Sequence, residues 1–148
     1  MKNLKLTFIA SILMITNFLS AQVFDKQDLK IYPKPEKGYQ QFVIDLPHSD
    51  SNNNKKVEIS VGKTIETDSC NHYFLAGEII TNTLNGFGYD YYTFKTDGNI
   101  ASTLMGCGDN NKINKFVTSP PFLTRYNGLL PIVIYPKNKM ITSFDYRE

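Results

Sequence analysis

The residues best suited to do chemistry lie between Ala101 and Cys107, in the run Ala-Ser-Thr-Leu-Met-Gly-Cys. The centre of the run holds Leu104 and Met105, two apolar side chains without a branch at Cβ, and an Asp97-Gly98 turn precedes it. Chymotrypsin-like proteases accept such a segment when it is extended and exposed, because their specificity pocket is an apolar slot for one side chain. The sequence therefore predicts an exposed loop that a protease would cut between Leu104 and Met105.

The cysteine two residues beyond that bond changes what cleavage would do. A disulfide at Cys107 would hold the new chain ends together, and oriented intramolecular reactions reach effective molarities of about 10⁵ M or more. The cut bond would then rejoin, so a substrate would become an inhibitor. The other cysteine is Cys70, and an even count in an exported chain favours one disulfide, with two free thiols as the alternative. A disulfide between the two cysteines would close a loop of about 38 residues and would add roughly 4 kcal/mol to the free energy of unfolding.

Two other kinds of site chemistry draw on the same region. A Cys-His hydrolase built from Cys70 or Cys107 with His72 needs a thiolate and a third group, and the sequence suggests no such group. A metal site at Asp68, Cys70 and His72 lacks a fourth ligand and a recognisable spacing. The other histidine is His48. We interpret His72 as a solvent-facing loop residue and expect neither enzyme activity nor a metal or other cofactor.

The amino terminus has the pattern of a signal peptide. Lys2 and Lys5 give a positive start, residues 6–19 form a nearly unbroken apolar run, and Ala21 is a small residue at a cleavage site. The run is short for a bilayer span, so a retained transmembrane helix is the weaker interpretation. We expect residues 1–21 to be removed, residues 22–148 to form one domain in the periplasm, and no membrane contact after removal.

The charge balance of the mature chain excludes one class of partner. Removal of Lys2 and Lys5 reduces the 16 basic residues to 14, which equals the number of acidic residues. A formally neutral chain without a basic stripe is not expected to bind nucleic acid. Removal of 21 residues from 148 leaves 127, a size that fits one domain with a sizeable core.

Strand patterns recur along the chain, and no window of ten residues carries a helical period. In the clearest of them, Val57, Ile59 and Val61 alternate with polar residues, which indicates a strand with one buried face. Gly62-Lys63 and Asn85-Gly86 mark turns, the second a hairpin turn. The fold class is therefore all-β, a single-domain antiparallel sandwich or barrel-like fold with long exposed loops. The expected strands are residues 42–46, 57–61, 64–68, 73–80, 89–94, 115–118, 130–135 and 142–146.

Aromatic residues gather on one expected strand, at Tyr89, Tyr91, Tyr92 and Phe94. Such a stripe is more often core and cross-strand packing than a binding surface. On an exported sandwich it is also compatible with sugar binding. An exported carbohydrate-binding or adhesive β-sandwich is therefore the alternative function.

Taken together, the motifs resemble the ecotin family, periplasmic inhibitors of chymotrypsin-like serine proteases. The resemblance covers nearly the whole mature chain in order, and the run from Gly88 to Tyr92 and the loop at 102–107 are specific. Matching segments include Tyr32-Pro33, Glu36-Lys-Gly38, Val43-Ile44, Lys56-Val-Glu58, Cys70-Asn71, Gly88-Tyr-Asp-Tyr-Tyr92, Ser102-Thr103, Cys107, Lys115-Phe-Val-Thr118, Arg125-Tyr-Asn127 and Leu130-Pro-Ile-Val133.

The resemblance implies roles for specific residues. The reactive bond falls on Leu104-Met105, within a reactive loop that also contains Ala101, Ser102, Thr103 and Gly106. The disulfide is Cys70 to Cys107, and a supporting loop contains His72, Tyr73 and Phe74. The best-known relative carries methionine where this chain has Leu104, so we expect a preference for chymotrypsin-like and elastase-like pockets.

The resemblance also implies a homodimer whose second surface grips the protease again. The matching positions are Phe87, Gly88, Tyr89, Asp90, Arg125, Tyr126, Asn127, Leu129 and Leu130. This chain departs from the family by Pro120-Pro121 and by the short segment after Tyr135, which lacks most of the tail that relatives exchange between subunits. The sequence therefore leaves a homodimer open.

Overall fold

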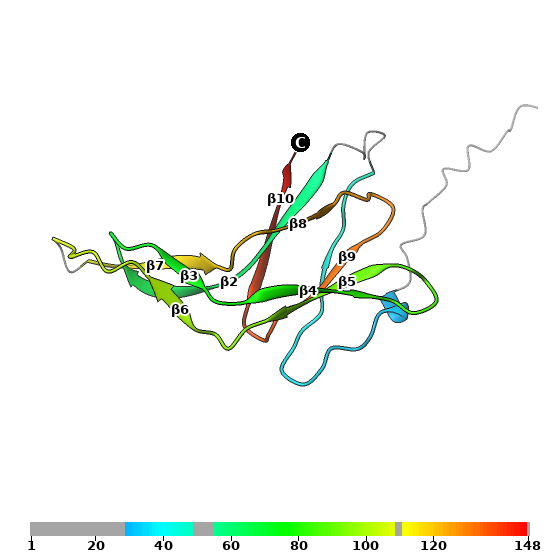
Figure 1. Cartoon of the computed structure of the whole chain (residues 1–148), viewed down its shortest axis with the longest axis horizontal. Coiled ribbons are helices and arrows are strands. Elements are labelled where there is room, and N and C mark those ends of the chain that lie inside the picture. Colours follow the sequence, from blue (N-terminus) through cyan, green and yellow to red (C-terminus); the bar gives the residue numbers. More distant parts are fainter. Residues whose placement is uncertain (1–28, 49–54, 109–110, 148) are drawn as a thin grey trace, which may run out of the picture.

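The structure, a computed structural model, describes residues 29–48, 55–108 and 111–147, and its architecture there is all-β, as the sequence predicts. Figure 1 shows β2, β3, β6 and β7 extending to one end of the long axis, with the β4–β5 turn at the other end. The elements are the 3₁₀ turn η1 (Leu29–Ile31), β1 (Phe42–Ile44), β2 (Lys56–Asp68), β3 (Tyr73–Leu75), β4 (Glu78–Thr83), β5 (Asp90–Lys95), β6 (Ile100–Ser102), β7 (Lys112–Thr118), β8 (Phe122–Arg125), β9 (Ile132–Tyr135) and β10 (Ile141–Arg147).

The strands of the described residues form three sheets. One has the order β1-β9-β5-β4, the second places β2 between β10 and β7 with β8 also on β2, and the third is the pair β3-β6. All of these pairs are antiparallel except β5 with β9, which is parallel. β2 is the longest strand and contacts three others, so it joins the body of the molecule to the extension that carries the loop after β6.

The turn predicted at Gly62-Lys63 is wrong, because β2 runs through it without a break from Lys56 to Asp68. A Cβ atom at Gly62 would collide with the carbonyl oxygen of Val117 and would lie 3.0 Å from the ring of Phe116 on β7. The glycine therefore serves a close approach of two strands, a role that glycine has in strand interiors as well as in turns.

No pattern in the sequence predicted β8, and the break at Pro120-Pro121 explains why. Thr118 of β7 pairs with Gly62, whereas Phe122 of β8 pairs with Ile59, so the β7–β8 side has one residue more than β2. One extra residue on one of two paired strands is the arrangement of a β-bulge. The two strands are one antiparallel partner of β2, interrupted where the prolines cannot donate to the ladder.

The segment 73–80, predicted as one strand, is two strands in different sheets. β3 ends at Leu75 and β4 begins at Glu78. Between them, a Cβ at Gly77 would meet the buried ring of Phe94 at 2.5 Å. The chain turns from the β3-β6 pair into the larger sheet at this glycine.

The core follows the predicted alternation. Val57, Ile59 and Val61 of β2 are 0% exposed and belong to the main cluster, which also contains residues of β5 and β9. The hairpin predicted at Asn85-Gly86 is also present, since Thr83 pairs with Asp90 across it and Gly86 has a φ of 83°. The main cluster contains Ile44, Leu46, Val57, Ile59, Val61, Leu75, Tyr92, Phe94, Val117, Tyr126, Ile132, Ile134 and Met140.

The predicted signal peptide, residues 1–21, lies outside the described residues, as does the Asn-rich stretch at 49–54. Among the residues that are described, no helix has the length and apolar character needed to cross a bilayer.

Candidate functional site

The loop that follows β6 lies at one end of the long axis of the molecule (Figure 1). The predicted loop from Ala101 to Cys107 is wrong for its first two residues. Ala101 and Ser102 belong to β6 and pair with Phe74 and Tyr73 of β3. Beyond β6 the chain leaves the sheet, and Leu104 is 96% exposed. The strand pairing therefore fixes where the loop begins, while the side chain at its centre meets only solvent.

The predicted disulfide joins Cys70 to Cys107, with Cα atoms 5.9 Å apart. It ties the loop after β6 to the turn between β2 and β3. The carboxylate of Asp68 lies close enough to form a three-residue cluster with the two sulfurs, within 4.8 Å. Both sulfurs are bonded to each other, so neither is a thiolate that can attack a substrate or bind a metal strongly. The disulfide thus removes the hydrolase and metal interpretations of these cysteines.

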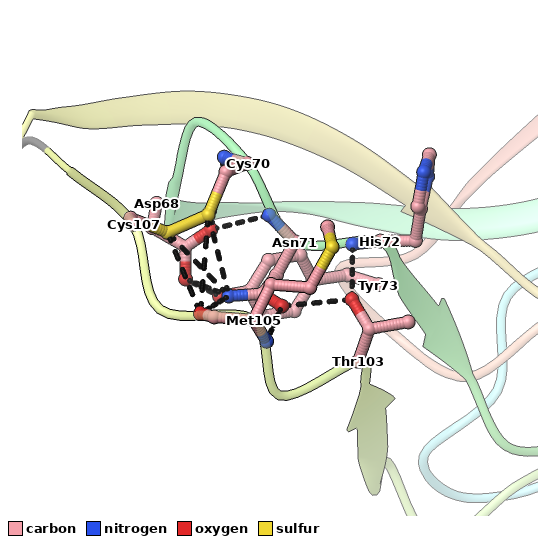
Figure 2. The surroundings of a disulfide bond; sticks show 8 residues. All are labelled: Asp68, Cys70, Asn71, His72, Tyr73, Thr103, Met105 and Cys107. Carbon is pink, nitrogen blue, oxygen red and sulfur yellow. Dashed lines mark hydrogen bonds between the residues drawn. A yellow bond between two sulfur atoms is a disulfide. The ribbon is translucent and has the colours of Figure 1, made fainter.

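Asn71 is the central polar residue of this region, and Figure 2 shows its amide between the disulfide and the loop. Its Oδ1 accepts hydrogen bonds from the Thr103 hydroxyl and from the backbone N of Met105, each at 2.8 Å. Its Nδ2 donates to the backbone O of Met105 at 3.2 Å. One side chain, only 6% exposed, therefore binds both backbone groups of the residue after Leu104.

The residue before Leu104 is held as well. The backbone N of Thr103 donates to the carbonyl of His72 at 3.0 Å, and the Thr103 hydroxyl accepts from the backbone N of His72 at 3.0 Å. Only the backbone of His72 takes part in these bonds, and its side chain is exposed. Leu104 is thus fixed on both sides while its own side chain has no packing partner.

Asp68, at the end of β2, organises the turn that carries Asn71. Its Oδ1 accepts from the backbone N of Cys70 at 3.2 Å and of Asn71 at 2.7 Å. Its Oδ2 accepts from Asn71 Nδ2 at 3.0 Å and from the Tyr73 hydroxyl at 2.6 Å. Hydrogen bonds from Tyr73 and then from Asn71 hold the pKa of this carboxyl at about 2, below its usual 3.8.

The same hydrogen bond raises the pKa of the Tyr73 hydroxyl, because the neutral phenol is the donor. Sequence reasoning missed the roles of Asp68 and Asn71. The available signal was the run Asp-Ser-Cys-Asn after a strand, since an Asp side chain commonly accepts from the backbone two and three residues on. The contact from Asn71 to Met105 spans 34 residues and leaves no local signal.

A second set of predicted site residues lies on the β4–β5 turn, at the start of β5, at the end of β8 and on the segment after β8. The β4–β5 turn, β8 and the segment after β8 line a groove of about 600 Å³. Phe87 and Leu129 are 52% and 54% exposed. Of the predicted secondary residues, the groove is lined by Gly88, Tyr89, Asp90, Arg125, Asn127 and Leu130.

Tyr126 differs from its predicted neighbours in this set. It is 7% exposed and belongs to the main core cluster, and its hydroxyl donates to the carbonyl of Pro47. Its ring packs against Tyr146 of β10, with centroids 5.8 Å apart. The structure therefore gives Tyr126 a core position beneath this surface, where it supports its neighbours Arg125 and Asn127.

The aromatic stripe at residues 89–94 is mostly packing, the interpretation that the sequence favoured. Phe94 is 0% exposed and Tyr92 is 6% exposed, so neither ring can stack on a sugar. Tyr91 is half-buried and lines a hollow of about 290 Å³ together with Tyr39 and Tyr135. The stripe is thus divided between two faces of the sheet and is not one binding surface.

Comparison with known proteins gives consistent matches. The family model described as Ecotin matches residues 28–145. Ecotin of Serratia proteamaculans (strain 568) is 45% identical over 111 residues, which cover 72% of this chain and 65% of that protein. Ecotin of Pseudomonas putida (strain W619) is 44% identical over 111 residues, covering 74% and 69%. The putative ecotin-like protein of Methylobacillus flagellatus (strain ATCC 51484 / DSM 6875 / VKM B-1610 / KT) is 41% identical over 113 residues, covering 74% and 70%. The match thus spans slightly less than two thirds of the first relative.

Proposed function

The chain belongs to the ecotin family, and on that basis we propose that it is an exported inhibitor of chymotrypsin-like serine proteases and not an enzyme. One observation supports this most directly: Leu104 is 96% exposed although the backbone on both sides of it is hydrogen-bonded to the turn after β2. A loop held in one shape avoids part of the ordering cost of binding. The exposed side chain supplies the apolar surface that the specificity pocket buries, worth about 1.5–3 kcal/mol for a leucine.

The proposed reaction is a reversible acyl transfer. The protease histidine takes the proton of the serine Oγ, the oxygen attacks the carbonyl carbon of Leu104, and the bond to the nitrogen of Met105 breaks. That nitrogen takes a proton from the protease histidine and leaves as an amine, while Leu104 becomes an ester of the serine. In the reverse step the amine attacks the ester, and the serine regains its proton.

The contacts of Met105 favour the reverse step. Asn71 Oδ1 accepts from the nitrogen that becomes the leaving amine, and Asn71 Nδ2 donates to the carbonyl of the same residue. Two residues later Cys107 is bonded to Cys70. The amine therefore stays beside the ester instead of diffusing away, and water gains little opportunity to hydrolyse it.

The residue at the centre of the loop sets the preferred protease. Leucine fits the apolar slot of chymotrypsin and the smaller apolar pocket of elastase, whereas the trypsin pocket contains an aspartate that favours a cation. We expect inhibition constants in the order chymotrypsin, elastase, trypsin, from tightest to weakest. Tightest inhibition of trypsin would contradict this preference, and no inhibition of any of the three would contradict the proposed function.

The groove between the β4–β5 turn and the segment after β8 is the proposed second contact. The β4–β5 turn, which forms one side of the groove, and the loop after β6 lie at opposite ends of the long axis (Figure 1), which supports the proposal that a protease bound to one loop contacts the groove of a second copy. Two linked contacts can raise apparent affinity by 10² or more. In this structure β10 pairs with β2 of its own chain, and its Phe144 and Tyr146 are 43% and 42% exposed.

Sedimentation of the mature chain at micromolar concentration tests the second contact. A dimer, together with weaker inhibition by Arg125→Ala, supports the two-surface proposal. A monomer would leave the loop as the sole contact. We also propose the periplasm as the compartment, after removal of residues 1–21, and mass spectrometry of the exported chain would locate the cleavage.

A further inference from the structure

The carboxylate of Asp68 uses its full capacity to accept hydrogen bonds. It receives four donors, two on each oxygen: the backbone N atoms of Cys70 and Asn71 on Oδ1, and Asn71 Nδ2 and the Tyr73 hydroxyl on Oδ2. An ionised carboxylate offers about four acceptor sites and no donor. Any group that faces Asp68 must therefore present a hydrogen atom to it.

This requirement fixes the orientation of the Asn71 amide. The amide has an acceptor on one side and two donors on the other. Because Asp68 accepts at 3.0 Å from Nδ2, the Oδ1 atom must face the backbone N of Met105 and the Thr103 hydroxyl. A flipped amide would bring two donors together at Met105 and two acceptors together at Asp68. Asp68 thus selects the one orientation in which Asn71 can accept from Met105.

Tyr73 connects this carboxylate to the body of the protein. Its backbone pairs with Ser102 across β3 and β6, and its ring packs against the main core cluster. Its hydroxyl donates to Asp68 Oδ2 at 2.6 Å, a short bond of the kind made to charged acceptors. The chain of contacts therefore runs from the core through Tyr73, Asp68 and Asn71 to the nitrogen of Met105.

We propose that Asp68 and Tyr73 are positioning residues that decide whether the chain behaves as an inhibitor or as a substrate. Neither side chain touches the bond to be cut. They act through Asn71, by holding its amide in the orientation that retains the Met105 amine after cleavage. The inference rests on the proposed function for its consequence, but the positioning itself can be measured in the free protein.

The first measurement is amide hydrogen exchange of the backbone N–H of Met105 by NMR, without protease. Tyr73→Phe removes only the hydroxyl, and Asp68→Asn replaces the acceptor-only group with one that tolerates either orientation of Asn71. Loss of a hydrogen bond to a charged group should accelerate exchange by roughly tenfold in Tyr73→Phe, and by more in Asp68→Asn. Tyr91→Phe is the matched control, because its hydroxyl has no hydrogen-bond partner within the described part of the chain.

The second measurement separates hydrolysis from binding. Each variant is incubated with a catalytic amount of chymotrypsin, and the cut chain is quantified by mass spectrometry beside the inhibition constant. We expect hydrolysis at the Leu104-Met105 bond to accelerate by roughly tenfold or more in Asp68→Asn. Melting curves show whether each variant is folded. Global unfolding would lower the fraction of folded inhibitor without changing the rate of hydrolysis per folded molecule.

The outcomes distinguish the two proposals. Unchanged Met105 exchange in both variants would overturn the positioning role, whatever the protease assay shows. Faster exchange with hydrolysis unchanged would overturn the claim that this network decides between inhibitor and substrate. If the wild-type chain does not inhibit but both variants still show faster exchange at Met105, the positioning role stands and the proposed function is contradicted.

Discussion

Asn71 holds the Met105 peptide group by both of its polar atoms, accepting from the backbone N at 2.8 Å and donating to the backbone O at 3.2 Å. The two residues are 34 positions apart, and the disulfide lies beside them. Nitrogen and carbonyl of one residue are thereby fixed relative to a buried side chain. These bonds hold the backbone on the side of Leu104 that would become the leaving amine in the proposed inhibition.

Leu104 should control affinity without affecting stability. Leu104→Asp would require a carboxylate to lose its water in an apolar pocket, and we expect the inhibition constant for chymotrypsin to rise by about a thousandfold or more. Because the side chain is 96% exposed, the free energy of unfolding should stay within about 0.5 kcal/mol of wild type. Leu104→Met keeps the volume and should remain within about tenfold. An aspartate variant that inhibits as well as wild type would remove Leu104 from the contact.

Asn71→Ala should affect both properties. The change deletes the acceptor for the Met105 N–H and the donor to its carbonyl, so the loop loses its fixed shape and cleavage should accelerate. We expect the inhibition constant to rise by about a hundredfold and the free energy of unfolding to fall by about 1–3 kcal/mol. Asn138→Ala, at an exposed turn position, is the control. Equal inhibition by both variants would show that the loop keeps its shape without Asn71.

Local patterns in the sequence were sufficient to predict the features that depend on residues close together in the chain. Alternation at Val57, Ile59 and Val61 identified a buried face because strand geometry has a period of two. The Asn85-Gly86 pair identified the hairpin because its turn requires positive φ. The exposed position of Leu104 followed from a segment that fits neither strand nor helix.

Features that depend on distant residues were not predictable in the same way. Gly62 has the sequence signature of a turn, and only the approach of Val117 on β7 shows that the glycine makes room for a second strand. Asn71 belongs to a polar bend in the sequence, and its role appears only when the loop at Met105 is placed beside it. The same residue types occur in local turns and in contacts between distant segments, so only the contacting residue shows which role a glycine or asparagine has.

The disulfide should contribute to stability and to inhibition by different routes. Its ends are separated by 37 residues, and the double variant Cys70→Ala, Cys107→Ala should lose about 4 kcal/mol in denaturant unfolding. In protease assays the variant should inhibit only transiently, because nothing covalent holds the segment after the cut. Recovery of chymotrypsin activity with time is the expected readout. Stable inhibition without the disulfide would assign retention of the amine to Asn71 alone.

The Asp68 network should weaken only in strong acid. The folded pKa of about 2 lies below the ordinary 3.8, so the ionised carboxylate is the form that the folded turn binds. The stability that it contributes is therefore complete above about pH 4 and is lost as the pH falls through about 2. NMR titration of the Asp68 carboxyl carbon and of the Met105 amide should give a shared midpoint near that value. In Tyr73→Phe the largest cause of the shift is absent, and the midpoint should move up toward 3.8. A midpoint near 3.8 in the wild-type chain would show that Tyr73 and Asn71 do not hold the carboxylate in solution, and the orientation of Asn71 would then need another cause.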